Sequence, residues 1–149
     1  MLRIGIAALV FASMAMAEGF TFTIGSPVAS QDYRFKAAAF VFRTENCAEP
    51  SQPQISASAE GIVNGERRSV VLRPMAGGKP GVYGIAQAWP NEGRWVVSLK
   101  GTCANSTAGA IVPIGRGGFI RESSKFFPRP ATEREIDASL KDLEQGGGK

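Results

Sequence analysis

Alternation of apolar and polar residues is the feature that most constrains the fold of this 149-residue chain. Phe20, Phe22 and Ile24 alternate with Thr21 and Thr23. A period of two is typical of a strand that buries one face, because successive side chains point to opposite sides of a sheet. The pattern therefore predicts a half-buried strand at residues 20–24.

The segment Arg34 to Arg43 carries apolar residues on both faces. Phe40 and Phe42 occupy one face, and Ala39 and Val41 belong to the other. A strand that is apolar on both sides is typical of the interior of a sheet that is covered on both sides. We expect this segment to be a central strand.

A hairpin is predicted around Asn64-Gly65. Apolar and polar residues alternate from Ile55 to Glu60, and the segment Arg67 to Arg73 supplies a return strand. Asn-Gly accepts the positive φ angles of a type I′ turn, whose twist matches that of the flanking strands. The following segment, Met75 to Pro80, contains paired glycines and predicts a flexible loop.

A second hairpin is predicted from Gly81 to Lys100, with its turn at Pro90 to Gly93. Two further short strands are expected at Ala110 to Ile114 and Gly118 to Arg121. Six to eight short strands separated by turn signals are typical of an antiparallel sandwich. The predicted fold class is all-β, an antiparallel immunoglobulin-like β-sandwich with a short C-terminal helix.

The N-terminus has the pattern of an export signal. Arg3 precedes an apolar run from Ile4 to Phe11, and Ala15-Met16-Ala17 places small residues before a cleavage point at Glu18. The apolar run is shorter than the roughly 20 residues that span a bilayer. Residues 1–17 are therefore predicted to be a signal peptide and residues 18–127 the sandwich domain, in the periplasm or outside the cell. An uncleaved membrane anchor is the alternative interpretation.

The net charge limits the kinds of partner that we expect, and the cysteine content indicates the compartment. The formal charge is +4, and without Arg3 the 16 basic and 13 acidic residues leave +3. This small, scattered charge predicts no nucleic-acid partner. Cys47 and Cys103 predict a disulfide in an oxidising compartment. A redox pair and a metal site are the alternatives for these two residues.

The C-terminal tail, residues 128–149, is predicted to contain a short amphipathic helix. Thr132 followed by Glu135 matches a capping box. Ile136, Leu140 and Leu143 recur at helical spacing along one face. This apolar stripe either docks on the domain, stays disordered or binds a partner.

The residue types exclude several kinds of chemistry. The chain has no histidine, which removes the Ser-His-Asp and Cys-His arrangements and the commonest metal ligand. Met75 is the only methionine after the predicted leader, and no clustered carboxylates of a calcium loop are present. We therefore predict no cofactor, no metal site and no catalytic residues.

Carboxylate pairs are the remaining route to acid–base catalysis. Glu45 with Glu49 and Glu60 with Glu66 are the candidates. We interpret both pairs as solvated surface charge, so a carboxylate-dependent hydrolase is a remote alternative.

The aromatic residues provide the candidate binding positions. Trp95 alternates with Val97 and Leu99 and is predicted to lie in the core. Trp89, next to Pro90, has no such pattern and is either a surface or a core residue. We select Tyr83 and Trp89 as candidate binding residues, together with the stripe of Ile136, Leu140 and Leu143.

The segment around these aromatic residues carries a family resemblance. Pro80-Gly81 and Tyr83 are followed by Trp89-Pro90, Gly93 and Trp95, and the pattern lies within about Gln54 to Gly101. It resembles the late hairpin of periplasmic immunoglobulin-like sandwiches such as the YtkA/FixH-like and CopC-like domains. The resemblance implies a sandwich fold and an envelope location. Copper handling does not transfer, because the histidine and methionine ligands of the copper-binding members are missing here.

Three functional hypotheses follow. The first is an exported, non-enzymatic module with a protein-interaction or structural role, whose partner is another envelope protein. Its candidate contacts are the loops Met75 to Pro80 and Trp89 to Gly93. The second is a small-ligand module for a sugar or lipid, which requires a concave apolar site between the sheets or exposed aromatic rings, and which a pocket walled by Trp89 would favour. The third is the carboxylate-dependent hydrolase.

Overall fold

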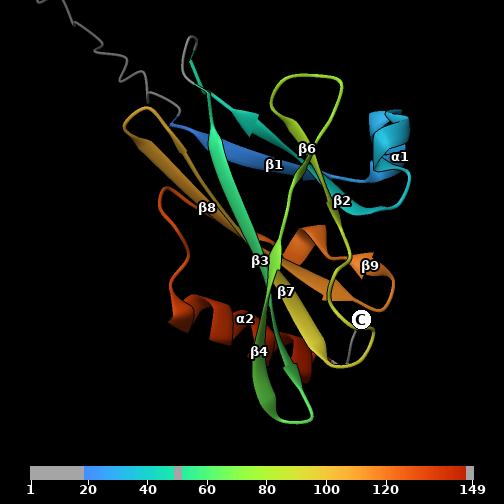
Figure 1. Ribbon diagram of the computed structural model, residues 1–149. Coiled ribbons are helices and arrows are strands. Elements are labelled where there is room, and N and C mark those ends of the chain that lie inside the picture. Colours follow the sequence, from blue (N-terminus) through green and yellow to red (C-terminus); the bar gives the residue numbers. More distant parts are fainter. Residues whose placement is uncertain (1–18, 49–51, 147–149) are drawn as a thin grey trace, which may run out of the picture.

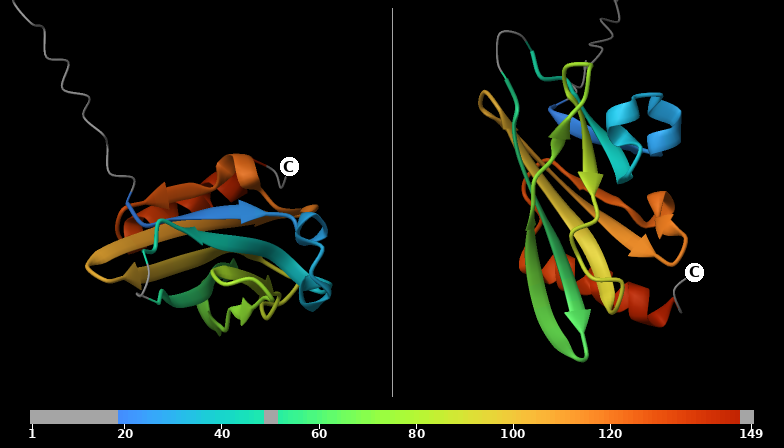
Figure 2. Two further views of the ribbon diagram at one scale, coloured as in Figure 1. Left: turned by 90° about the horizontal axis from the view of Figure 1, so that it is seen from above. Right: turned by 45° about the vertical axis from the view of Figure 1, so that its right-hand side comes forward.

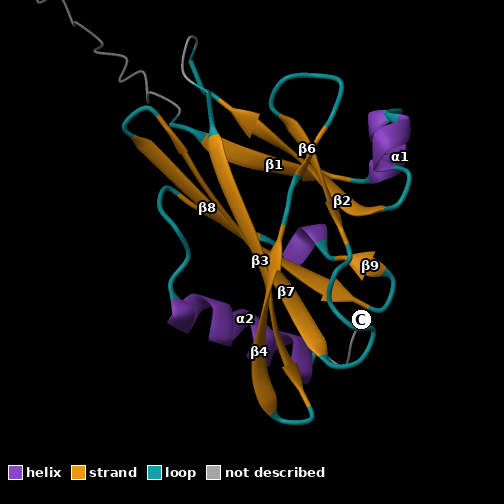
Figure 3. Ribbon diagram, in the orientation of Figure 1, coloured by secondary structure: helices purple, strands orange, loops and turns teal. Residues whose placement is uncertain are grey.

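The computed structural model describes residues 19–48 and 52–146, which form two antiparallel sheets and a C-terminal helix (Figures 1 and 3). The predicted leader lies outside the described residues. The first sheet has the strand order β1 (Thr21–Gly25), β2 (Ala38–Glu45), β6 (Val82–Ala86) and β5 (Met75–Ala76). The second has the order β10 (Lys125–Phe127), β8 (Ser106–Gly115), β7 (Arg94–Cys103), β3 (Gln54–Val63) and β4 (Glu66–Leu72), with β9 (Gly118–Phe119) beside β8.

The two sheets bury a common apolar core, which confirms the predicted all-β sandwich. Phe40 and Phe42 of β2 belong to the same cluster as Val97 and Leu99 of β7, and all four are almost completely buried. Figure 2 shows the first sheet on one side of the second sheet and the C-terminal helix, α2 (Glu133–Gln145), on the other. The second sheet is therefore covered on both faces.

The central position predicted for residues 34–43 is correct, but the strand begins later than expected. β2 lies between β1 and β6, with Phe40 and Val41 buried on opposite faces. The chain before it forms the short helix α1 (Pro27–Ser30) and the 3-10 turn η1 (Tyr33–Phe35). Asp32 caps that turn by accepting from the backbone N–H of Arg34, and this local bond competes with strand pairing.

The first predicted hairpin is confirmed. β3 and β4 pair from Val63 with Glu66 to Ala57 with Leu72, around a turn in which Asn64 has φ 52° and Gly65 φ 78°. β4 is the last strand of its sheet and pairs with β3 alone among the described strands.

The second predicted hairpin is wrong. β6 lies in the first sheet, whereas β7 lies in the second and pairs with β3 and β8. The connection at residues 87–93 crosses between the sheets, and both Trp89 within it and Trp95 after it are buried in the core. Burial of these two rings explains the crossing, and it also places Trp89 in the core rather than at the surface.

β7 forms its hairpin with β8 instead, around Ala104 and Asn105, where Ala104 has φ 53°. β8 is longer than the expected strand at Ala110 to Ile114. Its first half contains Gly109, where a Cβ atom would come within 2.3 Å of the carbonyl oxygen of Arg129. The first half of β8 consists of small residues, which give no alternating apolar pattern and so did not predict a strand. At Gly109 the small size is needed because the chain leading to α2 passes close by.

A short edge strand replaces part of the predicted loop at Met75 to Pro80. Met75 and Ala76 form β5 and pair with Gly84 and Tyr83 of β6. Two residues carry too little of an alternating pattern to predict a strand from sequence.

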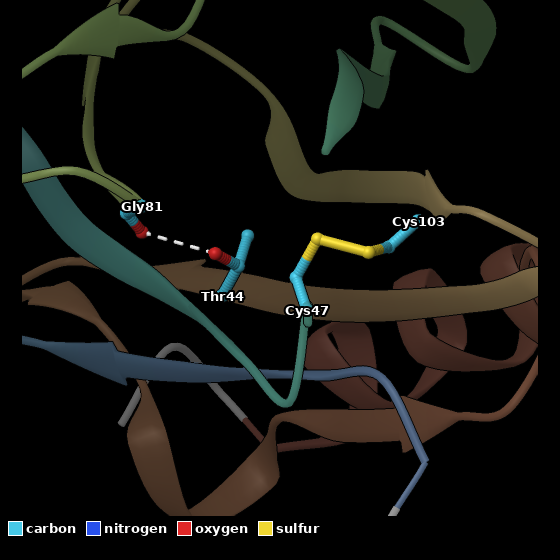
Figure 4. Close-up of a disulfide and its surroundings, with 4 residues drawn as sticks. All are labelled: Thr44, Cys47, Gly81 and Cys103. Atoms are coloured by element: carbon cyan, nitrogen blue, oxygen red, sulfur yellow. Dashed lines mark hydrogen bonds between the residues drawn. A yellow bond between two sulfur atoms is a disulfide. The ribbon is translucent and has the colours of Figure 1, made fainter. Parts of the chain in front are cut away.

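The disulfide predicted between Cys47 and Cys103 is present, with the two Cα atoms 5.7 Å apart. Cys47 follows the end of β2, and Cys103 is the last residue of β7, so the bond joins the two sheets (Figure 4). Next to it, the backbone N–H of Thr44 donates to the carbonyl of Gly81 at 2.9 Å, which joins β2 to the start of β6.

Replacing both Cys47 and Cys103 by serine is expected to lower the free energy of unfolding by about 2–4 kcal/mol, because the unfolded chain is no longer restricted by a closed loop. Chemical denaturation of the variant and of the oxidised protein measures the difference. Reduced wild type should match the variant. Detection of two free thiols in the unreduced protein would show that the bond is absent.

The predicted C-terminal helix is confirmed and lies on the second sheet. Thr132 Oγ1 accepts from the backbone N–H of Glu135, and the Glu135 carboxylate accepts from the backbone N–H of Thr132, which completes the capping box. Ile136 and Leu140 pack against Val96 of β7 and Ile111 of β8. No helix among the described residues is long and apolar enough to cross a membrane.

Glu135 makes the start of α2 sensitive to acid. Hydrogen bonds from Arg129, together with the bond from the Thr132 backbone, lower the pKa of Glu135 from its ordinary 4.5 to about 2. The carboxylate is thus favoured in the folded state, and its stabilising contribution is present above pH 4.5 and is lost as the pH falls toward 2.

We expect Glu135→Gln to lower stability at neutral pH and to flatten the dependence of stability on pH between about 4.5 and 2. Thermal unfolding across this range measures both effects, and the curves of wild type and variant should converge at the acid end. Glu92→Gln, at an exposed position with no side-chain partner among the described residues, is the control. A constant difference from wild type over the whole range would contradict the prediction.

Candidate functional site

A groove lies at the end of the sandwich where the β6–β7 connection, the β8–β9 turn and the last turn of α2 meet. Its volume is about 780 Å³, within the roughly 300–1,000 Å³ of small-molecule sites. Its lining includes five large apolar side chains: Trp89, Trp95, Ile114, Phe119 and Leu143. Its polar lining includes Gln87, Asn91, Arg94, Arg116 and Glu144. We call this hollow the tryptophan groove.

The two tryptophans form the wall of the groove rather than a stacking surface. Trp89 is 5% exposed and Trp95 3% exposed. The indole N–H of Trp95 donates to the carbonyl of Glu92 at 2.9 Å. The Trp95 ring also lies close to Gly61 of β3, where a Cβ atom would come within 2.4 Å of the ring. The ring is therefore held both by a hydrogen bond and by close packing.

The β6–β7 connection is held by one amide side chain. Gln87 Nε2 donates to the carbonyl of Trp89 at 2.9 Å and to Asn91 Oδ1 at 2.8 Å. These bonds stabilise the bend that carries Trp89 inward and leave Asn91 at the rim, with its own amide N–H groups free to donate.

Two arginines contribute positive charge to the groove. Arg94, the first residue of β7, has a terminal nitrogen 3.6 Å from a carboxylate oxygen of Glu144 on α2. This distance is longer than a hydrogen bond. Its Nε atom is buried and makes no hydrogen bond to any described residue. Arg116 is exposed in the β8–β9 turn.

A smaller hollow of about 380 Å³ lies across Leu143, between α2 and the 3-10 turn η2 (Arg121–Ser123). Ser139 of α2 lines it; the residue is buried and its hydroxyl has no hydrogen-bond partner among the described residues. Lys125 and Asp142 lie at its edge with 3.7 Å between their charged atoms. Two buried side-chain polar atoms among the described residues lack a partner, Arg94 Nε and Ser139 Oγ. Each belongs to a residue that lines one of these two hollows.

A separate charged cluster fastens α2 to the sheet. Arg67 of β4 contacts Glu60 at 2.9 Å, Asp137 at 3.1 Å and Glu133 at 3.2 Å. Burial acts to lower the pKa of Arg67, but the hydrogen bonds to Glu60 and Asp137 outweigh it and raise that pKa above its usual value. The cluster holds the helix in place, and none of its members lines the tryptophan groove.

Three of the four carboxylates considered as pairs from sequence lie among the described residues, and each has a basic partner. Glu60 accepts from Arg67 and from the hydroxyls of Ser58 and Ser69, each at 2.9 Å. Glu66 is exposed and lies 3.7 Å from Arg68. Glu45 contacts Arg43 at 2.6 Å. Glu49 lies outside the described residues.

The five candidate binding residues are in three different places. Tyr83 stacks on Phe42 with ring centroids 5.2 Å apart. Ile136 and Leu140 are buried between α2 and the second sheet. Only Trp89 and Leu143 line the groove. The sequence analysis missed Arg94 and Arg116, because a single arginine at a strand end or in a glycine turn has no pattern that distinguishes it from surface charge.

No group of three or more acidic or cysteine side chains within the described ranges is placed to hold a metal ion. Searches against protein-family models, curated proteins and solved structures return no match to this chain.

Gly61→Ala is expected to lower the free energy of unfolding by about 1–3 kcal/mol, because the added methyl group collides with the Trp95 ring and with the carbonyl of Arg94. Gly117→Ala is the matched control, since a Cβ atom at Gly117 meets nothing within 4 Å. Urea denaturation followed by tryptophan fluorescence compares the two variants. Equal free energies of unfolding for the two variants would show that the Trp95 ring is not closely packed against Gly61.

Proposed function

We propose that this chain is an exported, non-enzymatic binding module that holds a small ligand in the tryptophan groove. The observation that carries the proposal is a hollow of about 780 Å³ with an apolar wall and unpaired hydrogen-bond donors. Concave sites of this size with a few convergent polar groups are the usual form of small-ligand sites. Of the hypotheses raised by the sequence, the small-ligand module is the one that a pocket walled by Trp89 favours.

A polar ligand suits the groove better than a lipid. Five of its lining side chains are charged or carry an amide, as many as the large apolar ones. A lipid chain needs a continuous apolar cavity, because every polar group that it covers loses its hydrogen bonds to water. The buried tryptophan faces also offer no platform on which a sugar ring can stack.

The exported location is supported by two independent features. The Cys47–Cys103 disulfide is typical of an oxidising compartment. Residues 1–17 have the charge and hydropathy pattern of a signal peptide. We propose the periplasm or the medium as the location.

The non-enzymatic role is supported by the state of the acidic side chains. Without histidine, catalysis would depend on free carboxylates. Glu60 is engaged by an arginine and two serine hydroxyls, and Glu45 by an arginine. Glu144, the acidic residue in the groove, stands alone there, whereas glycoside hydrolysis uses two facing carboxylates.

Binding of another envelope protein is the second candidate function. Val28 of α1 is 86% exposed and Tyr33 of η1 is 80% exposed. Aromatic side chains such as that of Tyr33 are enriched at protein interfaces. This surface lies on elements that do not line the tryptophan groove, so the two candidate functions are separable by mutation.

A protein-observed NMR screen tests the proposed function. The 15N-labelled chain, expressed with its own N-terminal segment, is titrated with a fragment library. Amide shifts are expected to cluster at residues 87–95 and 114–119. Asn91→Trp fills the rim of the groove and should abolish these shifts, whereas Asn105→Trp places the same ring on the distant β7–β8 turn and should not. Shifts that lie elsewhere, or that survive Asn91→Trp, would overturn the proposal.

A further inference from the structure

We infer that the ligand of the tryptophan groove is an anion, a molecule carrying a carboxylate, phosphate or sulfate group, recognised by Arg116 and Arg94. The inference rests on the proposed function, since it assigns the chemical class of ligand to that same groove.

Among the side chains of the groove, those that keep a free hydrogen-bond donor outnumber those that keep a free acceptor. The amide N–H groups of Gln87 are already used by Trp89 and Asn91, and Asn91 Oδ1 is used by Gln87. The free donors are the Asn91 amide and the two guanidinium groups. The side-chain acceptors that remain are the carboxylate of Glu144 and the amide oxygen of Gln87. A ligand rich in acceptor oxygens satisfies this set better than one rich in hydroxyl or amine donors.

Arg94 is incompletely satisfied in its present position. Its contact with Glu144, at 3.6 Å, is an ion pair without a hydrogen bond, and its buried Nε has no acceptor among the described residues. A buried donor without a partner is unfavourable. A planar oxyanion can accept from two nitrogens of a guanidinium at once, so a small movement of Arg94 toward such a group improves its bonding.

Arg116 supplies charge that nothing else in the described chain neutralises. It lies at the β8–β9 turn, which Gly118 closes with φ 117°. It forms no ion pair with any described residue. Arg129, in contrast, has both terminal nitrogens on the carboxylate of Glu135. The absence of a partner leaves the whole guanidinium of Arg116 available at the rim.

The opposing charges are weaker than the two arginines together. Glu144 contributes one negative charge, and the C-terminal end of α2 contributes the equivalent of about half a negative charge. Both lie on the side of Arg94, so part of that residue's charge stabilises the helix end. The remaining positive charge is at Arg116, in the β8–β9 turn that also lines the groove. An anionic group bound by the arginines, with an apolar body against Ile114 and Phe119, matches this distribution.

Matched acid and amide fragments test the inference. Pairs such as benzoate and benzamide share shape and differ in charge, so any difference in affinity reports the charge. The acids are expected to shift the groove amides, to bind at least about 10-fold more tightly than their amides, and to weaken with added salt. Arg116→Gln should remove most of that difference, and Arg94→Gln should reduce it.

Arg134→Gln is the control, because it removes the same charge from an exposed position of α2 outside the groove. It should leave the affinities unchanged. Amides that bind in the groove as tightly as acids would overturn the anion inference while leaving the proposed function in place. Acid binding that is equally sensitive to Arg134→Gln and Arg116→Gln would also overturn it, since it would reflect net charge alone. If no acid and no amide shifts the groove, both proposals fail.

Discussion

The fold depends on the passage of the chain from one sheet to the other between Gln87 and Arg94. Trp89 and Trp95 lie on either side of this crossing and are buried in the core that the two sheets share. The close contact of Trp95 with Gly61 fixes β3 against β7, and the Cys47–Cys103 bond joins the sheets near the other end of β7. The tryptophan groove exists because the crossing leaves the end of the sandwich open beside the β8–β9 turn.

Local signals in the sequence predicted the elements whose structure is determined locally. Asn64-Gly65 specified its hairpin because few other residue pairs accept two positive φ angles. Thr132 and Glu135 specified the start of α2 because their side chains satisfy the free N–H groups of the first turn. In contrast, the partners of β6 and β7 were assigned wrongly. Adjacency in sequence favours a hairpin, whereas burial of Trp89 requires the crossing, and burial is a property of the whole core.

The site was less predictable than the fold for the same reason. Trp89 and Leu143 were selected from sequence, and they meet in space only because α2 lies along β7 and β8. Arg94 and Arg116 acquire their significance from what surrounds them, a loose ion pair in one case and a glycine turn without a partner in the other. A single sequence does not show which charged residues will lie next to either arginine. The apolar stripe of Ile136 and Leu140 predicted docking correctly as one of its alternatives, because a helix that buries one face contributes it to the nearest apolar surface.

The position of β4 at the end of its sheet affects how the molecule behaves in crowded surroundings. Its outer edge is the longest edge among the described strands that lacks a neighbour, and Val71 on it is 81% exposed. Such an edge can template a further strand and so begin a fibre. Arg67 and Arg68 lie along this edge, and the ion pair with Glu60 holds the Arg67 side chain in place. Two copies that pair edge to edge would have to remove these held charged side chains from water, which favours dispersed molecules over stacked ones.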